Sequence, residues 1–177
     1  NELFEVLSNS DLVRLHLSLN NNETRMTYID YHFYAQLTTC LMTKEKLERL
    51  SLHFSIEKYP KGLKSNIIVS LIKELSNLQA LDLEFLGNNF FSEEDIKKIF
   101  LILKERPSFA ELGLSLNIIQ IKEEKYTDLF SIITDPTTEK WRYYFLELRG
   151  ISSRDKSGFE NKIRAYFAKR KNRERLI

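Results

Sequence analysis

Few residues of this chain have the types and spacing that catalysis or metal binding requires. The three histidines, His16, His32 and His53, lie in separate stretches without the spacing of metal ligands. Cys40 and His32 could form a nucleophile–base pair, but no third group is placed to orient them. None of the glycines belongs to a phosphate-binding loop. The sequence therefore predicts a protein that is not an enzyme and that uses no cofactor, metal or small-molecule substrate.

Basic residues concentrate at the C-terminus. Residues 159–177 contain seven lysines and arginines against two glutamates, a net +5, which leaves −3 for residues 1–158 of a chain whose total is +2. Such a segment can bind an acidic protein surface or the phosphates of RNA. No RNA-binding signature is present, so RNA contact is the alternative to a protein partner. The candidate contact residues in this segment are Lys169, Arg170, Lys171 and Arg173.

Five leucine-rich tracts would have to position these residues. They begin at Leu12, Leu47, Leu78, Phe109 and Trp141, at steps of 35, 31, 31 and 32 residues, and each has apolar residues at offsets 0, 3, 5 and 7. A repeat of this length indicates stacked units that bury one continuous core. The alternation at offsets 3, 5 and 7 is typical of a strand with one buried face. We therefore expect Leu17, Leu52, Leu83, Leu114 and Leu146 to form one column across neighbouring strands.

Stretches with helical periodicity separate the tracts. Apolar residues of 67–75, 96–103 and 126–133 each form one helical face, and Ser92 followed by three acidic residues predicts a capped helix start. Alternation of strand and helix requires parallel strands with the helices on one side. The fold class expected is α/β, with the sheet on the concave face and the helices on the convex face. Residues 1–150 would form this array, and residues 151–177 a C-terminal capping helix with a basic tail.

The single cysteine, Cys40, excludes an internal disulfide and is expected to be a buried packing residue. No apolar run approaches the roughly 18 residues that span a bilayer, and the first residues do not show the basic stretch followed by an apolar stretch that is typical of a signal peptide. An intracellular location, cytoplasmic or organellar, is the resulting expectation.

The tracts resemble leucine-rich repeat proteins of the long-repeat, ribonuclease-inhibitor-like type. The family's Leu-x-x-Leu-x-Leu core stands at Leu12, Leu47 and Leu78, and in modified form at Phe109 and Trp141. The family's asparagine matches Asn20 and Asn117, and the irregular repeats look most like those abundant in protist proteins. The resemblance implies a solenoid that binds partners rather than catalysing reactions.

Offsets 2, 4 and 6 of each tract should point away from the core and form a binding face. This face would be basic at its first two strands and acidic toward its last three, and His16 and His53, at different offsets, would not be direct cross-strand neighbours. Two alternatives remain: the charges simply pair across strands, or the C-terminal segment folds over the aromatic residues. The candidate partner-binding residues are Arg14, His16, Arg49, His53, Asp82, Glu84, Glu111, Tyr143, Phe145 and Glu147.

The sequence thus favours a non-enzymatic protein–protein interaction scaffold or structural subunit of a larger intracellular complex. The alternative is an RNA-associated subunit that contacts phosphates through its basic C-terminal helix.

Overall fold

A computed structural model describes residues 2–20, 31–56, 65–87, 91–117, 126–138 and 140–149, with residues 161, 162, 165, 166 and 168. Helices and strands alternate along the chain. The helices are α1 (Glu2–Asn9), α2 (Tyr31–Met42), α3 (Asn66–Glu74), α4 (Glu93–Lys104), α5 (Tyr126–Ile133) and the short 3-10 helix η2 (Pro136–Thr138). The strands are β1 (Arg14–Asn20), β2 (Arg49–Ile56), β3 (Ala80–Gly87), β4 (Glu111–Asn117) and β5 (Arg142–Arg149).

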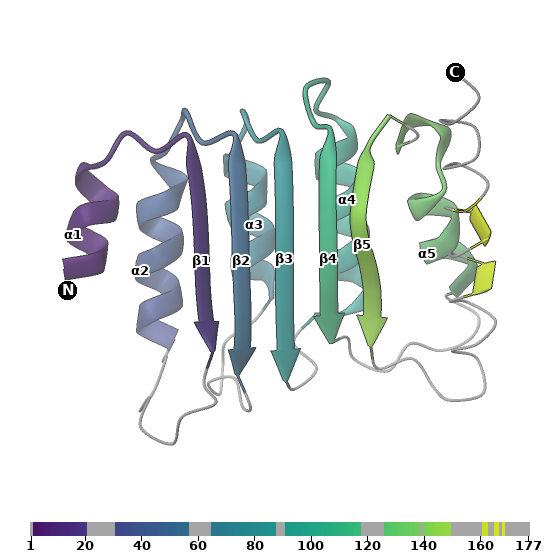
Figure 1. Cartoon of the computed structure of the whole chain (residues 1–177), viewed down its shortest axis with the longest axis horizontal. Coiled ribbons are helices and arrows are strands. Elements are labelled where there is room, and N and C mark those ends of the chain that lie inside the picture. The colour runs from purple at the N-terminus through teal and green to yellow at the C-terminus, as the bar shows by residue number, and fades with distance from the viewer. Residues whose placement is uncertain are drawn as a thin grey trace.

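The strands form one parallel sheet in the order β1-β2-β3-β4-β5, as Figure 1 shows. The expected α/β class is confirmed. The expected leucine column is also confirmed: Leu17 pairs with Leu52, Leu52 with Leu83, Leu83 with Leu114, and Leu114 with Leu146. All strands therefore run the same way, and each of the helices α2–α5 lies in the connection between two neighbouring strands, whereas α1 precedes β1.

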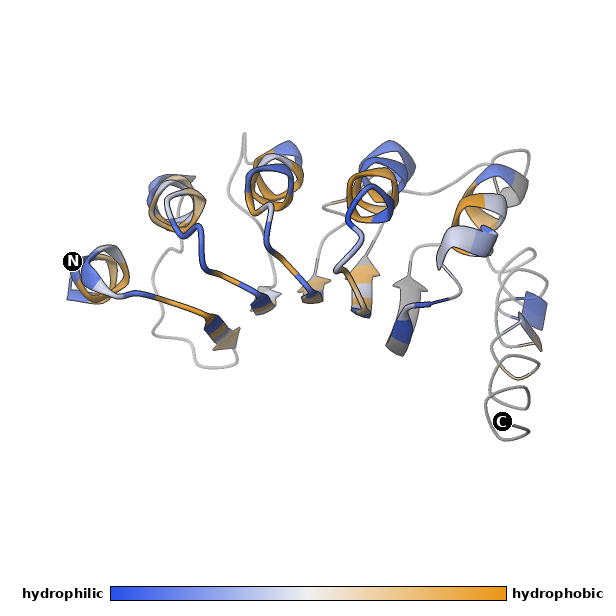
Figure 2. Ribbon diagram, turned by 90° about the horizontal axis from the view of Figure 1, so that it is seen from above, coloured by the Kyte–Doolittle hydropathy of each residue, from blue (hydrophilic) through white to orange (hydrophobic). Residues whose placement is uncertain are grey.

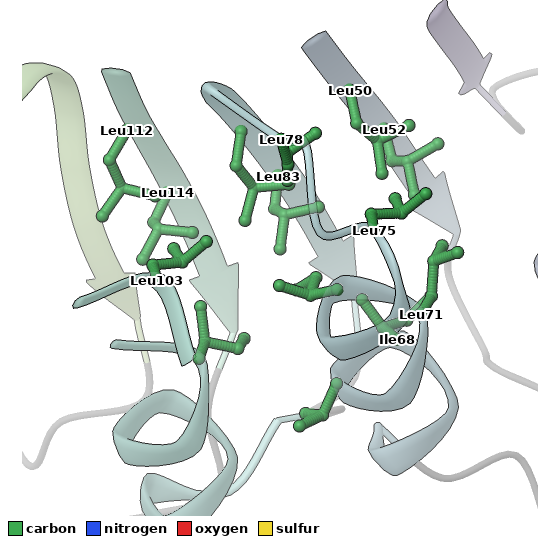
Figure 3. Packing of buried hydrophobic residues seen from close by; sticks show 14 of the residues in the cluster. Leu50, Leu52, Ile68, Leu71, Leu75, Leu78, Leu83, Leu103, Leu112 and Leu114 are labelled. Carbon is green, nitrogen blue, oxygen red and sulfur yellow. The ribbon is translucent and has the colours of Figure 1, made fainter. Parts of the chain in front are cut away.

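All five α-helices lie on one side of the sheet (Figure 2). Between the two layers, alternate residues of β2–β4 and one stripe of each of the helices α2–α5 are buried. Figure 3 shows Ile68 and Leu71 on the side of α3 that faces Leu52 and Leu83, and Leu103 of α4 beside Leu114. This packing supplies the stability that parallel strands, far apart in sequence, must gain to offset the loss of chain entropy.

Aromatic rings extend this core from one unit to the next. Tyr34, Phe54, Phe85 and Phe91 form a chain whose successive ring centroids lie 5.4, 5.1 and 5.2 Å apart, in the edge-on geometry that aromatic pairs prefer. Trp141 is fully buried, as its place in the first slot of its tract predicts. The prediction for Cys40 is confirmed in part: it is a free cysteine that packs against the core, but it is only partly buried.

Polar side chains close the helix ends. Ser92 caps the start of α4, as expected, and it forms a capping box with Asp95: the Ser92 hydroxyl accepts from the Asp95 N–H at 3.2 Å, and the Asp95 carboxylate accepts from the Ser92 N–H at 2.8 Å. The Ser65 hydroxyl, just before α3, donates to the same carboxylate at 2.6 Å. One carboxylate therefore ties the starts of two neighbouring helices together.

Basic side chains link the C-terminal ends of neighbouring units. Lys44 donates to the carbonyl oxygens of Ser8 and Ser10, at 2.8 and 2.9 Å, where α1 ends. Arg106, itself 8% exposed, donates in the same way to the carbonyls of Ile72 and Lys73 at the end of α3. A cation is favourable there because the last carbonyls of a helix carry partial negative charge.

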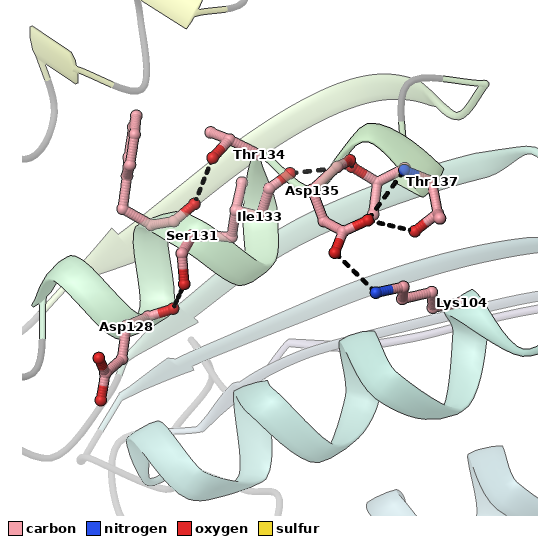
Figure 4. A network of polar contacts seen from close by, with 9 residues as sticks. Lys104, Asp128, Ser131, Ile133, Thr134, Asp135 and Thr137 are labelled. Atoms are coloured by element: carbon pink, nitrogen blue, oxygen red, sulfur yellow. Dashed lines mark hydrogen bonds and ion pairs between the residues drawn. The ribbon is translucent and has the colours of Figure 1, made fainter.

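A third link joins α4 to the end of α5 (Figure 4). The Lys104 ammonium lies 2.6 Å from the Asp135 carboxylate, which also accepts from the N–H and hydroxyl of Thr137 at 2.9 and 2.5 Å. These donors, Lys104 first, hold the pKa of Asp135 at about 2, below its ordinary value.

The start of β5 departs from the expected register. Arg142 pairs with Glu111 and Tyr143 with Leu112, whereas Phe145 pairs with Gly113, so the strand carries an irregularity between them. The tract pattern placed Tyr144 opposite Leu112, which is wrong. Residues 143–146 are four successive aromatic or apolar residues, so their pattern fits either register, and a bulge absorbs the extra residue.

Candidate interaction face of the sheet

The sheet has one face covered by helices and one face over which no described helix lies (Figure 2). We call the second the open face. Along β2 and β3 its residues alternate with leucines and phenylalanines that are at most 1% exposed. Its described members in β1–β4 are Arg14, His16, Ser18, Arg49, Ser51, His53, Ser55, Ala80, Asp82, Glu84, Leu86, Glu111, Gly113 and Ser115.

A cluster of two histidines, a serine and an aspartate lies at the middle of β1–β3. His16 Nδ1 is 2.8 Å from Ser51 Oγ, and His53 Nε2 is 2.8 Å from Asp82 Oδ2. As expected, the histidines are not paired: His16 lies opposite Ser51, and His53 lies opposite Ser18. Their rings nevertheless meet along the diagonal, edge to face, with centroids 4.9 Å apart. The sequence argument missed this contact because it compared only directly opposite residues, whereas aromatic side chains also reach their diagonal neighbours on the next strand.

The cluster contains the residue types of a catalytic triad but not its geometry. In a triad, one ring nitrogen of the histidine contacts the serine and the other contacts the carboxylate. Here His53 Nε2 contacts both Ser51 Oγ, at 3.1 Å, and Asp82 Oδ2, at 2.8 Å. The other nitrogen, Nδ1, faces Glu84 Oε2 at 3.6 Å. The serine hydroxyl itself donates to Asp82 at 3.2 Å, so the arrangement is a cross-strand hydrogen-bond network.

Within the described part of the chain, no group of three or more His, Cys, Asp or Glu side chains is placed to hold a metal ion.

One hydrogen-bond acceptor of the histidine cluster has no donor among the described residues. Asp82 Oδ1 is buried and has no hydrogen-bond partner among the described residues. Buried polar atoms are nearly always paired, so this oxygen is an exception within an otherwise paired cluster.

An ion pair lies along the row of paired residues at the start of the five strands, which consists of Arg14, Arg49, Ala80, Glu111 and Arg142. Arg49 of β2 reaches over Ala80 of β3 to Glu111 of β4, with Nη1 2.7 Å from Oε2. The small side chain of Ala80 leaves room for this bridge. Arg14 is exposed at the β1 end of the same row, and Arg142, also exposed, occupies the β5 position.

These pairs modify the charge pattern that the sequence suggests. Arg49, His53, Asp82 and Glu111 largely satisfy one another, as the alternative of cross-strand pairing predicts. Arg142 adds a positive residue to a strand expected to be acidic. Exposure is greatest at β1, where Arg14, His16 and Ser18 are all exposed, and it falls toward β4, where Ser115 is 6% exposed.

Several predicted contact residues lie outside what the structure describes. The backbone of β5 is described, but the side chains of Tyr143, Phe145 and Glu147 are not. Lys169, Arg170, Lys171 and Arg173 also lie outside the described residues, so their role stays a prediction. The five described residues of 161–168 are helical, in keeping with a terminal helix.

Comparison with known protein families, curated proteins and solved structures found no match to this chain. Among the described residues, no helix combines the length and the apolar character needed to cross a bilayer.

Proposed function

We propose that the protein is a leucine-rich repeat solenoid that acts as a non-enzymatic interaction scaffold, or as a structural subunit of a larger intracellular complex. One observation carries this proposal: among the described residues, helices cover one face of an entirely parallel sheet and no helix covers the other. All-parallel sheets occur almost only with both faces covered. A partner seated on the open face would supply the second layer.

The arrangement of the layers supports a curved solenoid. The row of helices spreads more widely than the row of strands in Figure 2, as expected when units that are wide on one side stack side by side. The open face would then be the inner, concave surface. Rigid, tightly packed units would hold its side chains in place without help from the partner.

The size of the open face indicates how much of an interface it can provide. Strands of seven or eight residues at about 4.8 Å spacing cover roughly 20 by 23 Å, or about 450 Å². A stable protein interface buries about 800 Å² on each partner. The open face would therefore supply the centre of the interface, and adjoining surface such as the basic C-terminal segment would supply the rest.

The chemistry of the face suits a partner with mixed polar groups. Most charges of β2–β4 are already paired, so they would fix the partner's orientation more than they add affinity. Arg14 is exposed and would attract an acidic group of the partner.

A matched pair of serine substitutions tests the proposal. Ser18 is exposed on the open face, and Ser70 is exposed on α3. Ser18→Tyr should abolish recovery of the partner when the tagged protein is purified from its native cells, because the ring would separate the two surfaces. Ser70→Tyr should leave recovery unchanged. Equal recovery with both variants would contradict binding through the open face.

The same purification tests the RNA alternative. If RNA is recovered, its retention should fall steeply with salt and be lost when Lys169, Arg170 and Lys171 are changed to glutamine. If retention survives those changes, contact through the basic segment is excluded.

A further inference from the structure

The β1 end of the molecule exposes apolar surface that the rest of the sheet buries. Leu50, Leu52 and Phe54 of β2 are at most 1% exposed, whereas the residues paired with them in β1 are only partly buried. The large apolar side chains that are exposed in the described residues are Leu3, Val6, Val13 and Leu101, and the first three lie at this end. Apolar exposure is thus concentrated where β1 ends the sheet.

The outer edge of β1 carries backbone groups that no described strand pairs with. β1 is the terminal strand, and none of the described residues pairs with its outer edge. The Val13 carbonyl accepts from the Arg49 N–H at 3.2 Å, so the backbone groups of Val13 face β2. Successive residues of a strand direct their backbone N–H and C=O groups to opposite edges of the strand. The N–H and C=O groups of Arg14, His16 and Ser18 therefore point away from β2, to the outer edge. Such a row is a template for another strand.

Helix α1 determines what can bind beside this edge. It packs against α2 as α2 packs against α3, and Figure 2 shows it continuing the row of helices beyond β1. The helix position next to the edge is therefore already filled, while the strand position is not filled by any described residue. A second copy of the protein placed edge to edge would bring its own α1 into the same position. The geometry suits one extended strand that carries no helix on that side.

We propose that the outer edge of β1 binds a single extended segment of another polypeptide by strand addition, parallel to β1. Parallel pairing continues the register of every other strand pair in the sheet. Backbone hydrogen bonds would provide affinity, and alternate side chains would provide specificity. The backbone groups of this edge are not part of the open face, although the Arg14 and His16 side chains belong to it, so strand addition can be tested apart from the proposed function.

The pairing pattern defines the chemistry of the segment. Apolar side chains at alternate positions would cover Leu15, Leu17 and Leu19. Between them, acidic side chains would meet Arg14 and His16, which are exposed; no described residue forms an ion pair with Arg14. The β2–β3 pair already shows such a pairing, because His53 of β2 lies opposite Glu84 of β3.

The protein's own β3 therefore provides a probe. A fluorescent peptide with the sequence of residues 79–86 places Leu81, Leu83 and Phe85 at the apolar positions and Asp82 and Glu84 at the acidic ones. Fluorescence anisotropy with the full chain should show saturable binding. On binding, the amide hydrogens of Arg14, His16 and Ser18 should exchange more slowly. No saturable binding would overturn the proposal.

Backbone N-methylation supplies a matched control that leaves every side chain unchanged. The Gln79 carbonyl accepts from the Glu111 N–H of β4, so residues 79, 81 and 83 direct their backbone groups to the following strand. Beside β1, the N–H groups of Leu81 and Leu83 would face the edge, and those of Asp82 and Glu84 would face away. Methylating the first pair should weaken binding by about 10-fold or more, and methylating the second by less than about 3-fold.

Two further results would refute the proposal. Equal weakening by both methylated peptides would show that side chains alone adhere to the protein. A dimer of the protein that sedimentation detects, and in which the amide hydrogens of Arg14, His16 and Ser18 exchange more slowly than in the monomer, would show that a second copy occupies the edge.

Discussion

Replacing Phe85 with alanine tests whether the repeats share one continuous core. The Phe85 side chain is fully buried, and its ring lies 5.1 Å from that of Phe54 and 5.2 Å from that of Phe91. Removing the ring deletes its transfer free energy and leaves a cavity between two units, at a cost of about 4 kcal/mol. For a chain of 177 residues, the entropy of unfolding is about 0.37 kcal/mol/K, so the melting temperature should fall by about 10 °C.

Urea denaturation followed by circular dichroism measures the free energy directly, and the matched control is Leu101→Ala. Leu101 lies on α4 and is 49% exposed, so its truncation should cost less than about 1 kcal/mol. A loss below about 1 kcal/mol for Phe85→Ala, or equal losses for the two variants, would show that the aromatic chain does not bind the units together.

Three other substitutions test individual links. Ser92→Ala removes one half of the capping box with Asp95 and should lower the free energy of unfolding by about 1 kcal/mol, measured by denaturant titration. An unchanged free energy of unfolding would show that the capping box does not stabilise the protein. Arg106→Ala leaves the C-terminal carbonyls of α3 without their buried donor and should cost about 2 kcal/mol, whereas a neutral result would show that water replaces the guanidinium. Because the pKa of Asp135 in the folded protein is about 2, its contact with Lys104 stabilises the fold above about pH 4 and loses its effect as the pH falls toward 2. Asp135→Asn should therefore make stability less dependent on pH across that window in melting curves, and identical profiles would exclude the contact as the cause.

The repeat spacing was sufficient to predict the parallel sheet, because a one-residue slip would turn every leucine of a strand outward. The repeat spacing did not predict the register at Tyr143 and Tyr144, because pairing Leu112 with either residue keeps the apolar pattern of the strand. At that point backbone pairing, rather than hydrophobic pattern, decides the structure.

The site was predicted only at the level of which residues share a face. Placing His16 and His53 on that face required only the period of a strand, but their ring contact depends on rotamers that a sequence does not specify. The links of Lys44 and Arg106 to the preceding unit were also missed. Their sequence signal is a basic residue two positions after a helix end, which becomes interpretable once the neighbouring helix end is known to lie beside it.

Site-specific photocross-linking in the native cell tests the central claim most directly. A photoreactive residue at Ser18, on the open face, should capture a protein partner, and the same residue at Ser70, on the helix side, should not. Capture from Ser70 alone, or from both positions alike, would contradict an account in which the uncovered side of the sheet is where the protein binds.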